Sequence, residues 1–409
     1  MTAAVLISLT IALLSFIGMA RYHVLLALIS RAARSLSLHE KPLRDHPRFT
    51  ILVPAHNEEL GIAATVGSIH ALDYPRQAYR LIVIADNCTD QTAKAARACG
   101  AEVMERFDNA HRSKGYALEY ALKKLQLETT PAPDAIVVID ADTRVDRKLL
   151  QAFGNRILEG QEWLQGYYSV SNPDDSWRTQ LMTYAFALFN GVWLAGQDAL
   201  GLGCSLRGNG MAFAWNALSR QPWRAYGLAE DLEFSWHLRV AGEKIHFVPE
   251  ARVYGEIISG NEKASKAQRL RWEKGRAQLK AHFAPAVRQM PTSKFRRWLL
   301  LSDLKMLPLS RYFMATGVSW GASLGVVLLG FGRIDAAILG GILLGLNTFV
   351  FFTFAVYLSL PFRRLHLPWH YLKALTRVPF YVGWKFLLLL SRTPAQWVRT
   401  ERIKKDTEV

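Results

Sequence analysis

Short apolar runs recur between about residues 49 and 284, and most are followed by a stretch with the spacing of a surface helix. The runs predict strands at 49–53, 81–85, 102–105 and 135–139. Pro54 is expected to end the first strand. Helices are expected at 59–70, from Thr89 or Asp90 to Cys99, at 114–125 and at 228–238. This alternation favours an α/β fold, in which helices cover a mostly parallel sheet.

Three longer apolar runs lie at residues 3–20, 312–331 and 336–360. The last two reach the roughly 20 apolar residues that a membrane-spanning helix needs, so we expect two transmembrane helices within 312–360. Arg21 and His23 interrupt the first run, which is expected to span as far as Arg21. Gly18-Met19-Ala20 resembles the cleavage site of a signal peptide, but the first twenty residues contain no Lys or Arg. We therefore expect residues 1–30 to be a retained anchor.

The net charge of +16 would suit a nucleic-acid partner, but much of the excess flanks the apolar runs. The flanking cations are Arg31, Arg34, Lys41, Arg44, Arg48, Arg288, Lys294, Arg296, Arg297, Lys305, Arg363 and Arg364. Positive residues beside membrane spans favour the cytoplasmic side and attract anionic lipids. We therefore expect membrane lipids and no nucleic acid as partners. The pattern predicts a multi-pass protein of the inner (cytoplasmic) membrane, with its amino terminus outside and a cytosolic domain at 49–284.

Two further segments are expected at the membrane surface. Residues 285–311 form an interfacial segment before the second apolar run. Residues 369–390 carry Lys373, Arg377, Tyr381 and Lys385 at a spacing of four, which places a polar face on a helix. We expect that helix to lie in the interface, kinked at Pro379, within a basic cytosolic end at 361–409.

Acidic and amide residues follow the predicted strands, where parallel sheets bind ligands. They are Asn57, Glu58, Asp86 and Asp140. Asp140-Ala141-Asp142 places two carboxylates on one turn, a donor set that suits Mg²⁺ or Mn²⁺ shared with substrate phosphates. A solvated acidic turn is the alternative. Neither a dinucleotide fingerprint after the first strand nor a P-loop is present.

Other residues are candidates for binding the same substrate or for catalysis. Arg112, Lys114, Arg269 and Arg271 could meet the charge of a diphosphate. Asp231, beside Glu230 near the start of a predicted helix, is either a helix-stabilising acid or a general base. Trp272 could stack on a sugar, or belong to a core. Gly201, Gly203, Gly208 and Gly210 make a loop that permits positive φ.

Seven ordered strings, VPAHNEE, DNCTD, SKGYAL, DAD, GNG, ED and QRLRW, resemble the membrane-bound inverting glycosyltransferases of family 2. That family includes cellulose, chitin and hyaluronan synthases and bacterial exopolysaccharide glycosyltransferases. The resemblance runs from about residue 49 to 278, and it implies the GT-A fold with one amino-terminal and two carboxyl-terminal membrane helices. Ala229 stands where many synthases carry Thr, and Thr143 where some relatives place His. Because of these departures, the substrate is not assigned by analogy. Polysaccharide synthases that extrude their own product usually have more membrane helices than the three expected here, so a channel formed by the protein itself is not assigned either.

The resemblance also implies a role for each matching residue. Asp231 would be the general base, with Glu230 beside it, and Asp142 would ligate the metal. The donor would be held by Asn57, Glu58, Asp86, Lys114 and Asp140. A clamp over the diphosphate and acceptor would consist of Gln268, Arg269, Arg271 and Trp272. Gly208, Asn209 and Gly210 would shape the acceptor floor.

These roles imply sugar transfer from a nucleoside diphosphate sugar, most simply UDP-linked, to a growing glycan or a lipid-linked acceptor. The bond would be β, and the pathway would be cell-surface or exopolysaccharide synthesis, with export or polymerisation machinery as a candidate partner. Three alternatives stay open. A single-transfer polyprenyl-phosphate enzyme would need the QRLRW clamp less, and a non-catalytic scaffold should have lost its acids. A membrane-tethered nucleic-acid binder would need cations interleaved with aromatic residues on one soluble face.

Overall fold

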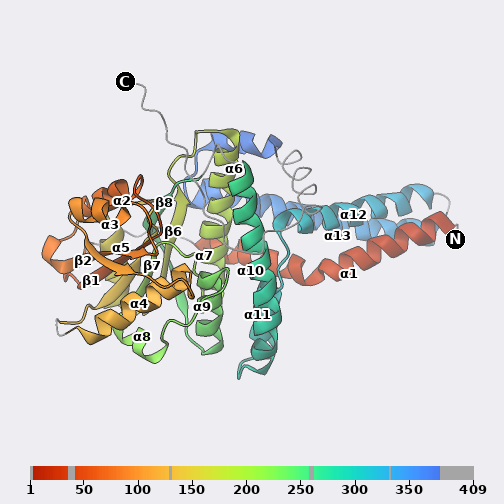
Figure 1. The fold of residues 1–409 in the computed structure, drawn as a ribbon. Coiled ribbons are helices and arrows are strands. Elements are labelled where there is room, and N and C mark those ends of the chain that lie inside the picture. Colours follow the sequence, from red (N-terminus) through yellow and green to blue (C-terminus); the bar gives the residue numbers. More distant parts are fainter. Residues whose placement is uncertain (1–2, 36–41, 129–130, 258–261, 331–332, 378–409) are drawn as a thin grey trace.

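The computed structural model describes residues 3–35, 42–128, 131–257, 262–330 and 333–377, and for residues 262–273 only the helical backbone. An α/β domain occupies one end of the molecule, and a bundle of long helices extends from it (Figure 1). The two parts meet through a layer of helices that includes α7, α10 and α11 (Figure 1).

The domain is built on one eight-stranded sheet, ordered β3-β2-β1-β4-β7-β6-β8-β5. The strands are β1 (Phe49–Ala55), β2 (Tyr79–Asp86), β3 (Glu102–Arg106), β4 (Ala135–Val138), β5 (Thr143–Val145), β6 (Trp163–Val170), β7 (Met211–Ala214) and β8 (Ile245–Gly255). The predicted parallel arrangement is confirmed for β1 to β4. The second half is mixed, because β7 runs antiparallel to β4 and β6, and β5 antiparallel to β8.

Helices cover both faces of this sheet. They are α2 (Ile62–His70), α3 (Thr92–Ala98), α4 (Lys114–Leu127), α5 (Leu149–Leu158), α8 (Trp215–Arg220) and α9 (Glu230–Val240). Side chains alternate across β1: Ile51 and Val53 pack with α2 and α5, whereas Leu52 packs with α4. This period of two is what a strand buried on both faces requires.

Two predicted boundaries were wrong at β1. Pro54 lies inside β1, where it is in register with Ile84 of β2. The strand tolerates it because the pairing of β1 with β4 ends at Leu52, so one side of β1 has no ladder there. The following helix begins at Ile62 rather than at residue 59, because Gly61 and Ile62 first turn back to the carbonyl of Glu58.

A second helical layer lies on the side of the long bundle. Helix α6 (Trp177–Phe186) continues through a π-helical segment, η3 (Ala187–Val192), into α7 (Trp193–Ala199). Helix α10 (Glu262–Gln289) runs past residue 284, the expected end of the domain, and α11 (Lys294–Leu304) follows. Within the segment expected at the interface, 285–311, the structure therefore places the end of α10, all of α11 and the start of the next helix.

Among the residues that the structure describes, three helices are long and apolar enough to cross a membrane: α1 (Ala3–Ala32), α12 (Leu309–Leu329) and α13 (Ile334–Arg364). They pack against one another as a bundle (Figure 1). Helix α1 includes residues 3–30 of the expected anchor at 1–30 and continues for eleven residues beyond Arg21, where the span was expected to end. It can do so because Leu25, Leu26 and Ile29 are fully buried in the main core, which also contains residues of α7.

The carboxyl-terminal amphipathic segment is described only in part. Residues Trp369–Arg377 form a 3₁₀ helix, η4, which packs against α6. The rest of the predicted interfacial helix, including Pro379, lies outside the described residues.

Candidate active site

Lys114 joins three segments at the carboxyl edge of the sheet. It begins α4, where the side chain of Ser113 caps the helix by accepting a hydrogen bond from the amide of Tyr116. Its ammonium group donates to the carboxylate of Asp140, just beyond β4, and to the carbonyl oxygen of Gly208. Burial disfavours the charged form, but attraction by Asp140, Glu230 and Asp231 outweighs it and raises the pKa of Lys114. Lys114 is therefore a fixed cation in this site.

The GNG loop was expected to form the acceptor floor. Gly208 has φ of 78°, and a Cβ atom built there would lie 3.3 Å from Oδ2 of Asp231. Gly210 has φ of 63°, and its Cβ would lie 2.8 Å from Val253. Between them, Asn209 is fully buried. Its Oδ1 accepts from the amide of Asp140 at 3.1 Å and its Nδ2 donates to Oγ1 of Thr143 at 2.7 Å. The Asn209 side chain therefore holds the DAD turn.

Asp231 lies in the first turn of α9, as the sequence indicated. Its Oδ1 accepts a hydrogen bond of 2.8 Å from the amide of Leu232, and its carbonyl accepts from Ser235 at 2.8 Å. The hydroxyl of Ser235 also accepts from the amide of Leu206 at 2.7 Å. These bonds fix the start of α9 against the glycine-rich loop, so Asp231 faces Gly208.

Tyr168 of β6 is a buried phenol whose pKa is influenced by three of the predicted site carboxylates. Burial raises the pKa of its phenol well above the ordinary value, and the charges of Asp142, Asp140 and Asp231 raise it further. A hydrogen bond with Asn209 acts in the opposite direction. The phenol therefore stays protonated, and the joint action of Asp142 and Asp231 in one site stays a prediction. The sequence analysis missed Tyr168, because its strand carries no charge and no turn signal that would single it out.

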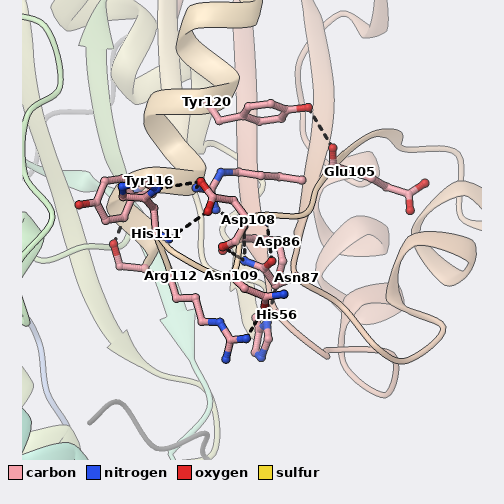
Figure 2. Close-up of polar contacts among 12 residues, drawn as sticks. His56, Asp86, Asn87, Glu105, Asp108, Asn109, His111, Arg112, Tyr116 and Tyr120 are labelled. Atoms are coloured by element: carbon pink, nitrogen blue, oxygen red, sulfur yellow. Dashed lines mark hydrogen bonds and ion pairs between the residues drawn. The ribbon is translucent and has the colours of Figure 1, made fainter. Parts of the chain in front are cut away.

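The donor-side residues lie past the ends of β1 and β2. Asp86 is buried, and its Oδ1 accepts a hydrogen bond of 2.7 Å from Arg106. Burial raises the pKa of Asp86, while Arg106 opposes that shift. His56 Nδ1 lies 2.7 Å from the carbonyl oxygen of Asp86 (Figure 2). Arg106 was also missed, since it closes a strand and resembles an ordinary surface cation.

Asn57 and Glu58 form the neighbouring turn. Asn57 has φ of 57°, and its Oδ1 accepts a hydrogen bond of 2.7 Å from the amide of Thr89. The amide of Glu58 donates to Oγ1 of Thr92 at 2.7 Å. These bonds join the loop after β1 to the loop after β2, so the three expected donor residues Asn57, Glu58 and Asp86 lie on adjacent loops.

Aromatic and basic residues lie in and beside the loop between β3 and α4. Tyr116 stacks on Tyr226, with ring centroids 4.4 Å apart and planes inclined by 15°. His111 Nδ1 lies 3.0 Å from Asp108, and Arg112 reaches Asn109 (Figure 2). Arg112 thus contacts Asn109 within the loop that precedes α4, and its expected role at the diphosphate stays a prediction.

The predicted clamp residues Gln268, Arg269, Arg271 and Trp272 lie in α10, where only the backbone is described. The next described part of α10 contacts the acidic pair. A Cβ built on Gly275 would lie 2.9 Å from the Cβ of Ala229, which directly precedes Glu230. Helix α10 therefore passes against the start of α9, and the clamp segment immediately precedes this contact.

The carboxylates of the DAD turn fit a shared metal ion better than a protein-enclosed one. In the part of the chain that the structure describes, no group of three or more His, Cys, Asp or Glu side chains could hold a metal ion. Asp140 and Asp142 offer hard oxygen donors at a half-buried turn. Mg²⁺ and Mn²⁺ accept one or two such carboxylates when phosphate oxygens and water complete their coordination.

Parts of the chain are similar to known proteins. The chain is 24% identical over 255 residues to a probable glycosyltransferase of Bacillus subtilis, YdaM, covering 59% of this chain and 58% of that protein. It is 28% identical over 280 residues to a β-monoglucosyldiacylglycerol synthase of Nostoc sp., covering 66% and 57%. It is 30% identical over 174 residues to the UDP-forming cellulose synthase 1 catalytic subunit of Komagataeibacter xylinus, covering 39% and 22%. The chain thus matches less than two thirds of each of these relatives.

The fold is shared with a solved structure, the mannosyltransferase PcManGT of Pyrobaculum calidifontis in complex with GDP-mannose and Mn²⁺. The TM-score is 0.51 at 18% identity, covering 88% of this chain and 99% of that one. The family model described as "Glycosyltransferase like family 2" matches residues 46–275, more than half of the chain. The matched residues include the DAD turn, the GNG loop and Asp231. This protein belongs to the family 2 glycosyltransferases, with their GT-A fold.

Proposed function

We propose that the protein moves a sugar from a UDP-linked donor to a hydroxyl of a glycan or lipid-linked acceptor, with inversion and a β-linked product. One observation carries this proposal: Lys114 bridges Asp140 to the carbonyl of Gly208, and Gly208 in turn faces Asp231. This arrangement supports a site in which a cation for a leaving diphosphate lies near a carboxylate for a reacting hydroxyl. The names of the Komagataeibacter and Nostoc relatives support UDP and a β-linked product.

Each group would have a separate task. Asp231, beside Glu230, takes the proton from the acceptor hydroxyl as that oxygen attacks the anomeric carbon. Asn57, Glu58 and Asp86 hold the nucleoside. Lys114 and Asp140 position the diphosphate side of the donor, and Gln268, Arg269, Arg271 and Trp272 close over it. Gly208 leaves room for the acceptor beside Asp231, while Asn209 and Gly210 keep the loop in place.

Asp142, with Asp140, would hold the divalent cation, Mg²⁺ or Mn²⁺, together with the donor's phosphate oxygens. When bound, the ion supplies Lewis-acid stabilisation of the charge that develops on the departing diphosphate. The positive Lys114 limits repulsion between Asp140 and the other carboxylates. The structural relative solved with Mn²⁺ supports this assignment.

The setting would be the inner membrane. Helices α1, α12 and α13 would span it, as an anchor at 1–30 and a pair within 312–360. The cations at the ends of these helices support a cytosolic catalytic domain at 49–284. An interfacial segment at 285–311 and the basic end at 361–409 would lie on the same side. Cell-surface or exopolysaccharide synthesis is the process that this location supports.

The test uses the full chain in lipid nanodiscs, offered a panel of nucleotide sugars, with released nucleotide measured. We expect Asp231→Asn to lower turnover by about 10²- to 10⁴-fold and to leave donor affinity within about twofold of wild type. The matched control is Asp73→Asn, a carboxylate paired with Arg147 at an exposed surface, which should behave as wild type. Near-normal turnover of Asp231→Asn would refute the assignment of the base.

The metal is tested in the same assay. Activity should disappear in EDTA and return with Mn²⁺ or Mg²⁺, and Asp142→Asn should raise the concentration of ion needed for half-maximal turnover. Full activity in chelator would count against Asp142 as a ligand. If the wild-type protein releases nucleotide from no sugar in the panel, a non-catalytic scaffold becomes the better description.

A further inference from the structure

The loop at residues 225–229 contacts the three helices that carry the proposed catalytic groups. It leads directly into α9, in whose first turn Asp231 lies. It packs on α4, which begins with Lys114, and on α10, where Gly275 approaches Ala229. The predicted clamp precedes Gly275 on the same helix. The position of this loop therefore affects how the base, the cation and the clamp lie relative to one another.

On the side of α4, the loop lies directly against the helix backbone. A Cβ atom built on Gly115 would overlap the carbonyl oxygen of Ala225 and lie 3.3 Å from the Cα atom of Tyr226. Only glycine therefore permits this approach. The ring of Tyr226 stacks on that of Tyr116, with centroids 4.4 Å apart and planes inclined by 15°. Gly115 and Tyr116 directly follow Lys114, so the loop is attached to the turn that holds the proposed diphosphate cation.

The ring of Tyr116 is itself fixed by neighbours. The ring of His111 meets it edge-on, with centroids 5.0 Å apart, and the guanidinium carbon of Arg106 lies 6.0 Å from its centroid. Both neighbours contact Asp108: His111 Nδ1 lies 3.0 Å from that carboxylate (Figure 2), and Arg106 donates to it at 2.9 Å. Stacked and edge-on pairs of aromatic rings attract one another. Tyr226 therefore packs on an ordered support.

On the side of α9, the loop is bonded to the helix that it precedes. Oε2 of Glu233 accepts hydrogen bonds from the amides of Tyr226, at 3.1 Å, and Gly227, at 2.8 Å. Glu233 lies in the first turn of α9, and its own amide donates to the carbonyl of Ala229 at 2.9 Å. The loop and the first turn of α9, which includes Asp231, therefore form one hydrogen-bonded unit.

We propose that Tyr226 is a positioning residue, whose stacking on Tyr116 sets the distance between the proposed base and the diphosphate cation. These groups are the carboxylate of Asp231 and the ammonium group of Lys114, so the inference rests on the proposed function. Tyr226 is bonded to the first turn of α9, and Tyr116 belongs to the first turn of α4. The stack thus joins the two helix starts directly. Displacing reacting groups by about 1 Å lowers rates by up to about a hundredfold.

The test compares variants of the full chain in lipid nanodiscs. Tyr226→Ala removes the stack, and Gly115→Ala places a side chain where the loop now lies. We expect each to lower turnover at saturating donor about ten- to hundredfold and to leave UDP affinity within about twofold of wild type. Tyr226→Phe keeps the ring and should turn over at about the rate of wild type. The matched control is Tyr120→Ala, since Tyr120 lies one turn further along α4 and donates to the carbonyl of Glu105 at 2.9 Å (Figure 2).

Hydrogen–deuterium exchange gives a second measurement, which does not depend on activity. The amides of Tyr226 and Gly227 are protected by their bonds to Glu233. Their exchange should become about tenfold faster or more in Tyr226→Ala, because the loop loses its attachment to α4. It should stay as in wild type in Tyr226→Phe and Tyr120→Ala.

Three results would overturn the proposal. One is wild-type turnover by folded Tyr226→Ala, which would leave the stack a purely structural contact. Another is an equal loss of turnover in Tyr226→Ala and Tyr226→Phe, which would assign the effect to the hydroxyl. The third is a clear fall in UDP affinity in Tyr226→Ala, which would place the ring in the donor site. If Tyr226→Ala does not fold, Tyr226→Leu replaces it, with the same expected results.

Failure of the proposed function would be recognised separately. If wild type releases nucleotide from no sugar, the assignment of Asp231 and Lys114 to sugar transfer fails. Amide exchange in Tyr226→Ala then still decides whether the stack holds the loop in place. If wild type is active and Tyr226→Ala matches it in both turnover and exchange, the proposed function stands and the role of Tyr226 is refuted.

Discussion

Arg239 of α9 donates a hydrogen bond of 3.0 Å to Asp303 of α11, and the two side chains are only 1% and 7% exposed. Trp193 and Gln197 of α7 also donate to Asp303, at 3.1 and 2.8 Å. The helix that begins with Glu230 and Asp231 is thus fixed to the helix that precedes α12. A carboxylate buried with three donors orders the junction between the catalytic domain and the bundle.

The stability of the protein should fall when one partner of the Arg239–Asp303 pair is removed. Asp303→Leu leaves the Arg239 guanidinium buried without its counter-charge, so we expect the free energy of unfolding to fall by about 3–5 kcal/mol. The double variant Asp303→Leu/Arg239→Leu should recover part of that loss, because no unpaired charge remains. Thermal unfolding of the detergent-solubilised protein measures both. A single variant as stable as wild type would contradict the assigned role of the pair.

Substitutions at two glycines of one loop should distinguish the effect of backbone strain from the effect of a steric clash. Gly208→Ala and Gly201→Ala both place a side chain at positive φ, 78° and 68°, which should cost roughly 1 kcal/mol each. Only the Cβ at position 208 meets Asp231, at 3.3 Å, whereas nothing lies within 4 Å at position 201. Turnover should therefore fall about tenfold or more in Gly208→Ala alone. Equal turnover in the two variants would mean that Gly208 does not face the reacting groups.

The hydroxyl of Tyr168 should contribute to turnover. Tyr168→Phe keeps the ring contact with Phe186, whose centroid lies 5.1 Å away, and removes the hydroxyl that interacts with Asn209, the residue that holds the DAD turn. We expect a loss of about fivefold in turnover at saturating donor, the effect of losing one neutral hydrogen bond, that with Asn209. Tyr167→Phe is the control, because neighbouring residues of a strand face opposite sides of the sheet. The assignment fails if the two variants lose activity equally.

Asp198 should make stability depend on pH. Burial alone would raise its pKa, but His246, the amide of Phe247 and Lys244 together lower it. A lowered pKa in the folded state gives stability above the unfolded value near 4, and that stability is lost as the pH falls through the folded value. The advantage of wild type over Asp198→Asn in thermal unfolding should therefore be full at pH 7 and shrink below about pH 4. A constant difference across this range would exclude this linkage.

Strand ends and apolar lengths were predictable because they are local properties. Asp86 and Asp140 follow apolar runs, and neighbouring parallel strands bring such ends to one edge of a sheet. The lengths of the apolar runs likewise indicated the three long helices. Boundaries were less accurate where tertiary contacts override local signals. Pro54 stays in β1 because one side of that strand is unpaired, and α1 passes Arg21 because the catalytic domain buries its next turns.

The amino-acid sequence by itself determined the alternation of strands and helices, the lengths of the apolar segments, and the order of the acidic residues and glycines along the chain. Each of these properties depends on residues that are neighbours in the sequence. Only the tertiary structure decided that β6 pairs with β8 across some eighty residues, that three carboxylates raise the pKa of the buried Tyr168 phenol, and that the guanidinium of Arg239 pairs with Asp303. The physical reason is distance in sequence. A phenol or guanidinium acquires its role from groups brought to it by long-range packing, and no local pattern of residues records which groups those will be.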